Sequence, residues 1–137
     1  MADKRFREFV RHCEKWRKRL WLGAWDIVYE PVEKIDDGPA NSDTYTSLAE
    51  TETVADYLNA TVRFRVPPRG RGTLPSIEHI ACHEMVHILL ATYTDFVVSA
   101  IDHAHESDRA QLKERHDEAK ERTVTYLERI LMARRTA

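Results

Sequence analysis

A mostly apolar run in the middle of the chain constrains the fold more than any other feature. Residues 80–90 read IACHEMVHILL, and Glu84 is the only carboxylate among them. The run is too short to cross a bilayer, which takes about 20 residues. A helix that is apolar nearly all round is one that other elements cover. Ser76 follows Pro75 and is a favourable N-cap, so the sequence predicts a buried central helix from residue 77 to about residue 92.

Three polar residues inside this run have a spacing with chemical meaning. His83 and His87 are four apart and share one helix face, so their imidazoles can hold one metal ion, commonly zinc. Glu84 lies about 100° around the helix, beside the metal rather than on it. Zinc lowers the pKa of a coordinated water to about 7, and a carboxylate placed there accepts its proton. This is the H-E-x-x-H pattern of zinc metallopeptidases.

The alternative is a structural helix that carries two histidines and no metal. The flanks favour the metal site, because burying Glu84 without a partner costs free energy and apolar packing does not offset that cost. Cys82 adjoins the first histidine but points to a different side of the helix. It forms no C-x-x-C pair with the distant Cys13. We expect both cysteines to be small buried residues in a reducing compartment.

Length and composition bound the rest of the molecule. With 137 residues, 42% hydrophobic and 32% charged, the chain is expected to form one soluble domain, residues 1–137. The N-terminal segment lacks the apolar region of a secretory signal, and no stretch is long enough for a membrane helix. We therefore expect a cytoplasmic protein with no membrane partner. Nothing in the pattern indicates an oligomeric state.

Charge is segregated along the chain although the net charge is only −2. Residues 1–22 carry eight Lys or Arg against three acids, whereas residues 26–56 carry nine acids against Lys34 alone. A second basic segment, residues 61–75, has four arginines and no acid. Such segments can meet phosphate, but no nucleic-acid motif accompanies them. The interpretation favoured at this level is a solvated helix face attracted to the acidic middle of the chain.

The N-terminal half reads as a helix followed by strands. Apolar residues recur at three- and four-residue spacing over residues 4–21, which predicts an amphipathic helix ended by Gly23. Residues 25–30 alternate and predict a strand that stops at Pro31. A loop is expected over residues 33–47.

The remaining pattern completes an α+β arrangement. A second strand is expected within residues 46–57, and a clearer one over residues 60–66, where apolar and polar side chains alternate. A turn-rich connector follows at residues 67–72. Helical signals weaken over residues 95–110, and a last helix covers about residues 111–133. The order helix, two or three strands, helix, helix predicts a small sheet beside the helices.

A catalytic zinc takes three protein ligands and keeps one position open for water. Two ligands come from the H-E-x-x-H helix, and the third should lie on a later helix. The side chains available there are His103, His105, Glu114, His116, Asp117, Glu118 and Glu121. Glu118 points away from the apolar stripe of the last helix. His116 and Asp117 fall nearer the middle of that stripe, and Glu121 falls at its edge. Helical geometry alone leaves the third ligand open.

Two segments together resemble the small gluzincin-type metallopeptidases, which include the minigluzincins, ImmA/IrrE-like proteins and zincins encoded by bacteriophages. They are residues 83–90, HEMVHILL, and residues 121–131, ERTVTYLERIL. The phage group also resembles this chain near residues 22–27 and 60–64. In the family, the second glutamate of a pattern like E-E-x-V-V-x-x-L is the third zinc ligand, and it maps onto Glu121. Lys120 stands where that pattern has its first glutamate.

The resemblance implies a zincin-like minimal domain with an N-terminal helix, a small twisted sheet of two to four strands, the H-E-x-x-H helix and a C-terminal helix. It implies one Zn²⁺ per chain, held by His83, His87 and Glu121. Glu84 is then the general base that later delivers its proton to the leaving amine. The strand at residues 60–66, or one within residues 46–57, is expected to bind extended peptide.

The expected function is therefore hydrolysis of peptide or protein substrates through a zinc-activated water, and the arginines of residues 60–66 would favour acidic substrates. The main alternative is a catalytically silent zinc-binding module of the same fold that serves in binding or scaffolding. A nucleic-acid-associated protease is a further alternative, but the chain contains no C-x-x-C zinc ribbon. His79, one turn before His83, is either an outer partner of the site or a partly exposed residue.

Overall fold

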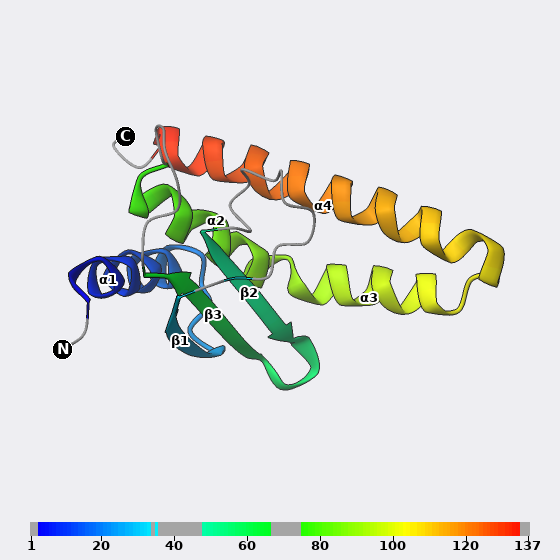
Figure 1. Cartoon of the computed structure of the whole chain (residues 1–137), viewed down its shortest axis with the longest axis horizontal. Coiled ribbons are helices and arrows are strands. Elements are labelled where there is room, and N and C mark those ends of the chain that lie inside the picture. Colours follow the sequence, from blue (N-terminus) through cyan, green and yellow to red (C-terminus); the bar gives the residue numbers. More distant parts are fainter. Residues whose placement is uncertain (1–2, 34, 36–47, 67–74, 135–137) are drawn as a thin grey trace.

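The computed structural model of the chain describes residues 3–33, 35, 48–66 and 75–134. These residues form an α+β fold of four α-helices and a three-stranded mixed sheet (Figure 1). The elements are α1 (Lys4–Arg19), β1 (Asp26–Val32), β2 (Ala49–Val54), the short 3-10 helix η2 (Ala55–Tyr57), β3 (Asn59–Arg65), α2 (Ile77–Leu89), α3 (Ala91–Asp102) and α4 (Glu106–Arg134). The connector predicted at residues 67–72 and most of the loop predicted at residues 33–47 lie outside the described residues.

The sheet has the order β1-β3-β2, with β3 parallel to β1 and antiparallel to β2. Alternate residues of β3 (Ala60, Val62 and Phe64) are buried, which confirms the predicted alternation. The prediction that the first strand stops at Pro31 was wrong, because β1 continues to Val32. β1 lies at an edge of the described sheet, where a residue without a backbone N–H costs little.

Helix α1 packs its apolar face on α2 and the sheet. Phe9, Cys13 and Trp16 are buried, and the Phe9 ring stacks on Phe64 with ring centres 4.4 Å apart. The helix begins at a side-chain cap, since an Asp3 carboxylate oxygen accepts the backbone N–H of Arg5 at 2.7 Å. The predicted amphipathic helix is therefore present, and its polar face points outward.

The end of α1 differs from the prediction. The helix ends at Arg19 rather than near Gly23. The Leu22 N–H donates to the Arg17 carbonyl at 2.9 Å, and the Trp21 N–H donates to the Lys18 carbonyl at 3.3 Å. This is a Schellman motif, which needs a left-handed residue just past the helix, usually glycine. Here Trp21 takes that conformation, with φ of 60°, and Gly23 does not end the helix.

Helix α2 is the centre of the fold and contacts α1, β2, α3 and α4 (Figure 1). The predicted N-cap is confirmed, because the Ser76 hydroxyl accepts the backbone N–H of His79 at 3.2 Å. All seven residues from 80 to 86 are buried. The burial inferred from the apolar run is thus confirmed, and the polar groups inside it must find partners within the protein.

The chain bends by 59° between α2 and α3. The predicted central helix ran on to about residue 92, and this end was wrong because α2 ends at Leu89. Helical signals were weak over residues 95–110, where the structure has most of α3. Neither glycine nor proline marks the bend, where the Leu90 N–H bonds back to the carbonyls of Val86 and Ile88. Helix α3 leaves Phe96 and Val98 exposed, and Ala91 is its one buried residue.

Helix α4 begins at Glu106, five residues before the predicted start, and runs back beside α3 and α2 (Figure 1). It packs on α2 through three buried residues, Val124, Glu128 and Met132. Within the described residues, no single helix is both long and apolar enough to span a bilayer. Helices α2 and α3 pass that test only as a joined pair with the bend between them.

Candidate metal centre

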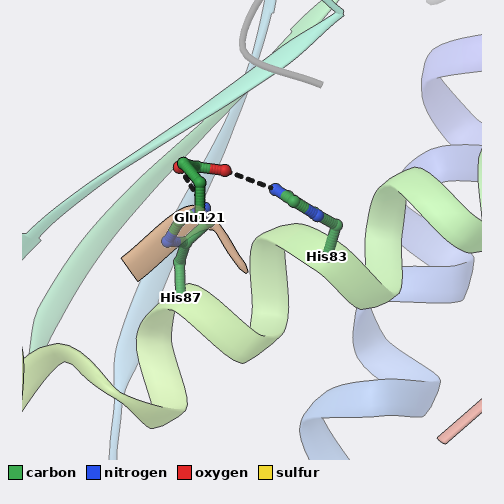
Figure 2. A group of neighbouring side chains, drawn as sticks. All are labelled: His83, His87 and Glu121. Atoms are coloured by element: carbon green, nitrogen blue, oxygen red, sulfur yellow. Dashed lines mark ion pairs between the residues drawn. The ribbon is translucent and has the colours of Figure 1, made fainter. Parts of the chain in front are cut away.

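Three side chains with metal-binding atoms converge where α4 lies against α2. His83 Nε2 is 3.3 Å from one carboxylate oxygen of Glu121, and His87 Nε2 is 3.3 Å from the other. Figure 2 shows the carboxylate of α4 between the two imidazoles of α2. One ligand atom from each residue lies within 4.8 Å of the others. Of the third-ligand candidates that helical geometry left open, Glu121 is the one that the fold brings to the histidine pair.

The other candidates lie away from this cluster. His103 and His105 are exposed near the turn between α3 and α4, where their Nδ1 atoms contact the Ser99 carbonyl at 2.7 Å and the Ser107 hydroxyl at 2.8 Å. The remaining candidates on α4 are Glu114, His116, Asp117 and Glu118. None of these four belongs to a group of potential metal ligands among the described residues.

The donor set has the residue types of a catalytic zinc site, and its ligand atoms lie within 4.8 Å of one another. Two imidazole nitrogens and one carboxylate make up a common catalytic zinc site. Ligands about 2.0–2.1 Å from a tetrahedral zinc lie about 3.4 Å from one another. The two nitrogen–oxygen separations of 3.3 Å are close to that value, but they run to different oxygens of Glu121 and are also ordinary ion-pair distances. The residues present could therefore hold a zinc ion, and three protein ligands would leave one coordination position for a water or a substrate.

The electrostatics of the cluster reflect close pairing of its members. Burial lowers the pKa of His83, but hydrogen bonds to Glu121 and Glu128 outweigh burial and raise it to about 9. Burial raises the pKa of Glu121, but its hydrogen bonds with His83 and His87 hold it well below its usual range. Glu121 is therefore an ionised carboxylate aimed at two imidazoles, and this negative charge favours a cation at the same place.

Glu84 is buried beside the histidines, with 2% of its surface exposed. The Thr51 hydroxyl of β2 donates a hydrogen bond of 2.5 Å to Glu84 Oε2. Burial raises the pKa of Glu84, although His87 and His83 act in the opposite direction. A carboxylate with a raised pKa is a stronger base than a solvated one, as proton abstraction from a water requires.

Glu128 is a further residue of the centre that the sequence analysis missed. It is 2% exposed, with one oxygen 3.4 Å from His83 Nδ1 and the other 3.2 Å from His79 Nδ1. Metal-binding histidines commonly hold a carboxylate at the second ring nitrogen, which fixes the ring and its tautomer. Glu128 lies seven residues after Glu121, so both share one face of α4. That spacing is the signal that could have found it.

A cleft of about 210 Å³ gives access to the centre between α2, α4 and β2. It is lined by Ala49, Glu50, Thr51, His83, Glu84, His87, Lys120 and Glu121. Lys120 is the one lysine or arginine among these lining residues. It also lines a more apolar groove of about 580 Å³ between α3 and α4. The cleft thus extends from the candidate metal ligands to the first three residues of β2.

One of the two arginines on which the expected acidic preference rested is occupied within the protein. Arg63 of β3 forms ion pairs with Glu52 at 2.9 Å, Glu30 at 3.3 Å and Glu50 at 3.5 Å. Three carboxylates thus surround one guanidinium, which leaves little positive charge for a substrate. Arg63 therefore gives no support to an acidic preference.

The two cysteines are buried and free, as expected. Burial raises the pKa of Cys82 to about 12 and that of Cys13 well above its usual range. Neither belongs to the group of candidate ligands, and a thiol with so high a pKa does not readily become the thiolate that binds metal.

Comparisons with models of protein families, with curated proteins and with solved structures gave no match. The gluzincin resemblance therefore stays a prediction. What bears on function is the geometry of the α2–α4 centre itself.

Proposed function

We propose that the protein is a zinc-dependent metallopeptidase, in which His83, His87 and Glu121 hold one zinc ion and Glu84 is the general base. The observation that carries this proposal is the convergence of three side chains with metal-binding atoms, within 4.8 Å of one another, next to a buried carboxylate that is not among them. When bound, zinc polarises the substrate carbonyl and acidifies a water molecule.

Glu84 moves the proton in the proposed reaction. Its carboxylate accepts a proton from the water whose oxygen attacks the carbonyl carbon, and it later donates that proton to the nitrogen of the departing amine. The carbon–nitrogen bond breaks and the water oxygen remains on the new carboxyl group. Thr51 holds one Glu84 oxygen through its hydroxyl, so the other oxygen is available for the water.

β2 is the strand proposed to bind the substrate backbone. Three of its residues line the cleft, and it lies at one edge of the described sheet. An extended peptide can add to such an edge through backbone hydrogen bonds. β3, the other strand expected for this role, is paired on both sides by β1 and β2 and has no edge to offer.

The test combines zinc stoichiometry with cleavage of an unbiased peptide library by wild type and Glu84→Gln. We expect about one zinc per chain in both proteins and cleavage only by wild type, since glutamine keeps the shape but cannot accept the proton. Substoichiometric zinc in freshly purified protein would remove the metal centre from the proposal. Stoichiometric zinc with no cleavage by wild type would assign the centre to a zinc-binding module instead.

A further inference from the structure

The outer face of α1 carries a stripe of five exposed cations on the side turned away from the core. Lys4, Arg7, Arg11, Lys15 and Lys18 recur at three- and four-residue spacing and are all exposed. The stripe extends for about 21 Å along the helix at about 1.5 Å per residue. We refer to these five residues as the α1 basic stripe.

The charges of the α1 basic stripe are not neutralised by the part of the chain that the structure describes. The ion pairs found there use other cations, such as Arg17 with Glu14 and Arg63 with three glutamates. None of the five stripe residues takes part in one. The sequence-level interpretation, a helix face attracted to the acidic middle of the chain, therefore has no contact to support it among the described residues.

Trp21 adds an aromatic surface at the C-terminal end of the stripe. Its side chain is 92% exposed, and its backbone holds the left-handed conformation that bulky residues disfavour. Glycine at this position would relieve the strain and remove an exposed indole from water. The indole borders a hollow of about 510 Å³ that Arg17 and Lys18 also line. Neither the strain nor the exposure helps the fold, which points to a ligand.

The combination of a row of cations with an exposed indole distinguishes between the polyanions that could bind here. A helix that binds a membrane inserts its apolar face among the lipids, but in α1 that face (Phe9, Cys13 and Trp16) is buried inside the protein. Single-stranded nucleic acid offers phosphates to a row of cations and unpaired bases to an exposed aromatic ring. A duplex offers the phosphates but keeps its base faces stacked inside.

We propose that the α1 basic stripe and Trp21 form a binding surface for single-stranded nucleic acid, with phosphates along the stripe and one base stacked on the indole. The surface is independent of the metal centre, because it uses a different helix and none of the cleft residues. Contacts to phosphates and to a base face carry no sequence information, so binding is expected to tolerate many sequences.

The first test is the salt dependence of binding to a fluorescently labelled oligothymidylate of about 20 nucleotides, followed by anisotropy. Five phosphate contacts to a single strand predict a slope of log K against log salt of about −3.5. The triple variant Arg7→Gln, Arg11→Gln, Lys15→Gln should reduce the magnitude of that slope by about 2. No binding at low salt, or an unchanged slope in the triple variant, would overturn the proposal.

The matched control removes three exposed cations from α4 instead, as Arg109→Gln, Lys113→Gln and Arg129→Gln. Both triple variants lose the same net charge, so a general electrostatic attraction would weaken in both. The proposal requires the α4 variant to keep nearly the wild-type slope. Equal losses in the two variants would contradict a localised surface on α1.

The second test separates the effect of the Trp21 indole on binding from its effect on stability. Trp21→Gly should keep or increase the melting temperature, because glycine suits the left-handed conformation, yet lower the affinity for the oligothymidylate about tenfold at an unchanged salt slope. Trp21→Phe should retain most of the affinity. Wild-type affinity in Trp21→Gly, or equal affinity for a duplex of the same length, would overturn the base-stacking contact. Binding to phosphatidylserine vesicles but not to the oligonucleotide would overturn the proposal in favour of a membrane.

Discussion

The polar residues of α2 and those of α1 are treated in opposite ways by the same fold. In α2, His83 and Glu84 are almost wholly buried, and each is met by a polar group from another element. In α1, the five cations of the basic stripe point to solvent and have no ion-pair partner among the described residues. The polar groups of α2 have partners inside the protein, whereas the charges of the α1 basic stripe face solvent and are available to a ligand.

This contrast follows from the cost of burying charge. A buried ionised group must be paired or it destabilises the fold, so the α2 centre is linked to stability as well as to any metal. An exposed lysine or arginine is hydrated and adds little to stability, so the α1 basic stripe is free to serve a ligand. Changes at the two regions should therefore differ in kind as well as in size.

The largest effect is expected from Glu121, the proposed third ligand on α4. Among the described residues, Glu121 is the one carboxylate with ion-pair contacts to both His83 and His87. Losing an outer partner of a metal ligand typically lowers metal affinity about 10–100-fold, and Glu121→Ala should lower zinc affinity by more than that. Competition with a chromophoric chelator measures it. Glu118→Ala, an exposed carboxylate one turn earlier on α4, is the matched control and should retain zinc. Equal affinities in the two variants would move the third ligand elsewhere.

Removing the buried carboxylate behind His83 should be next in size. Glu128→Ala leaves His83 Nδ1 without the oxygen that lies 3.4 Å away, and breaking a buried pair of this kind costs about 3 kcal/mol. Zinc affinity should also fall about 10–100-fold. Urea unfolding and chelator competition measure the two quantities. Glu128→Gln, which keeps an acceptor oxygen and the side-chain volume, should recover part of both; an Ala variant as stable as wild type would contradict the pairing.

The pH dependence of the stability of the metal-free protein tests the pairing of His83 with its carboxylate partners. Burial lowers the pKa of His83, but its carboxylate partners raise it to about 9, above the about 6.5 of an unfolded chain. The folded form holds this proton more tightly, so its contribution to stability is complete below about pH 6.5 and is lost as the pH rises through about 9. Urea midpoints at about pH 7 and pH 9 should show that loss, whereas zinc-loaded protein, whose ligands are already deprotonated, should not. Equal midpoints in the metal-free protein would argue against the pairing.

The smallest effect on stability is expected from the α1 basic stripe. Neutralising Arg7, Arg11 and Lys15 with glutamine, which has a similar helix propensity, should change the free energy of unfolding by less than about 0.5 kcal/mol per site. A larger loss at any one site would mean that the stripe has a partner within the protein, and the contrast with α2 would then disappear.

Local signals in the sequence determined the central helix and half of its site. The apolar run predicted burial of α2, Ser76 predicted its start, and the four-residue spacing placed His83 and His87 on one face. The alternation of Val62 and Phe64 likewise predicted the buried face of β3. These predictions succeeded because capping, helical periodicity and strand alternation depend on neighbours in the chain.

Other features depended on which surfaces meet. Helical geometry left Glu121 among several candidates, and its choice rested on resemblance until the contact of α4 with α2 placed it between the histidines. Glu128 was not found at all, because a glutamate on a long charged helix looks solvated until another helix covers it. The exposure of Trp21 was likewise invisible, since an aromatic residue beside an apolar one reads as core.

The sequence by itself thus determined where a buried helix with two histidines on one face lies. Only the tertiary structure decided which distant carboxylates complete that face and which cations stay uncovered. The physical reason is that local propensities act over one or two turns. The partner of a buried polar group is instead selected by the packing of the whole core, which brings residues 83 and 121 together across 38 positions of sequence.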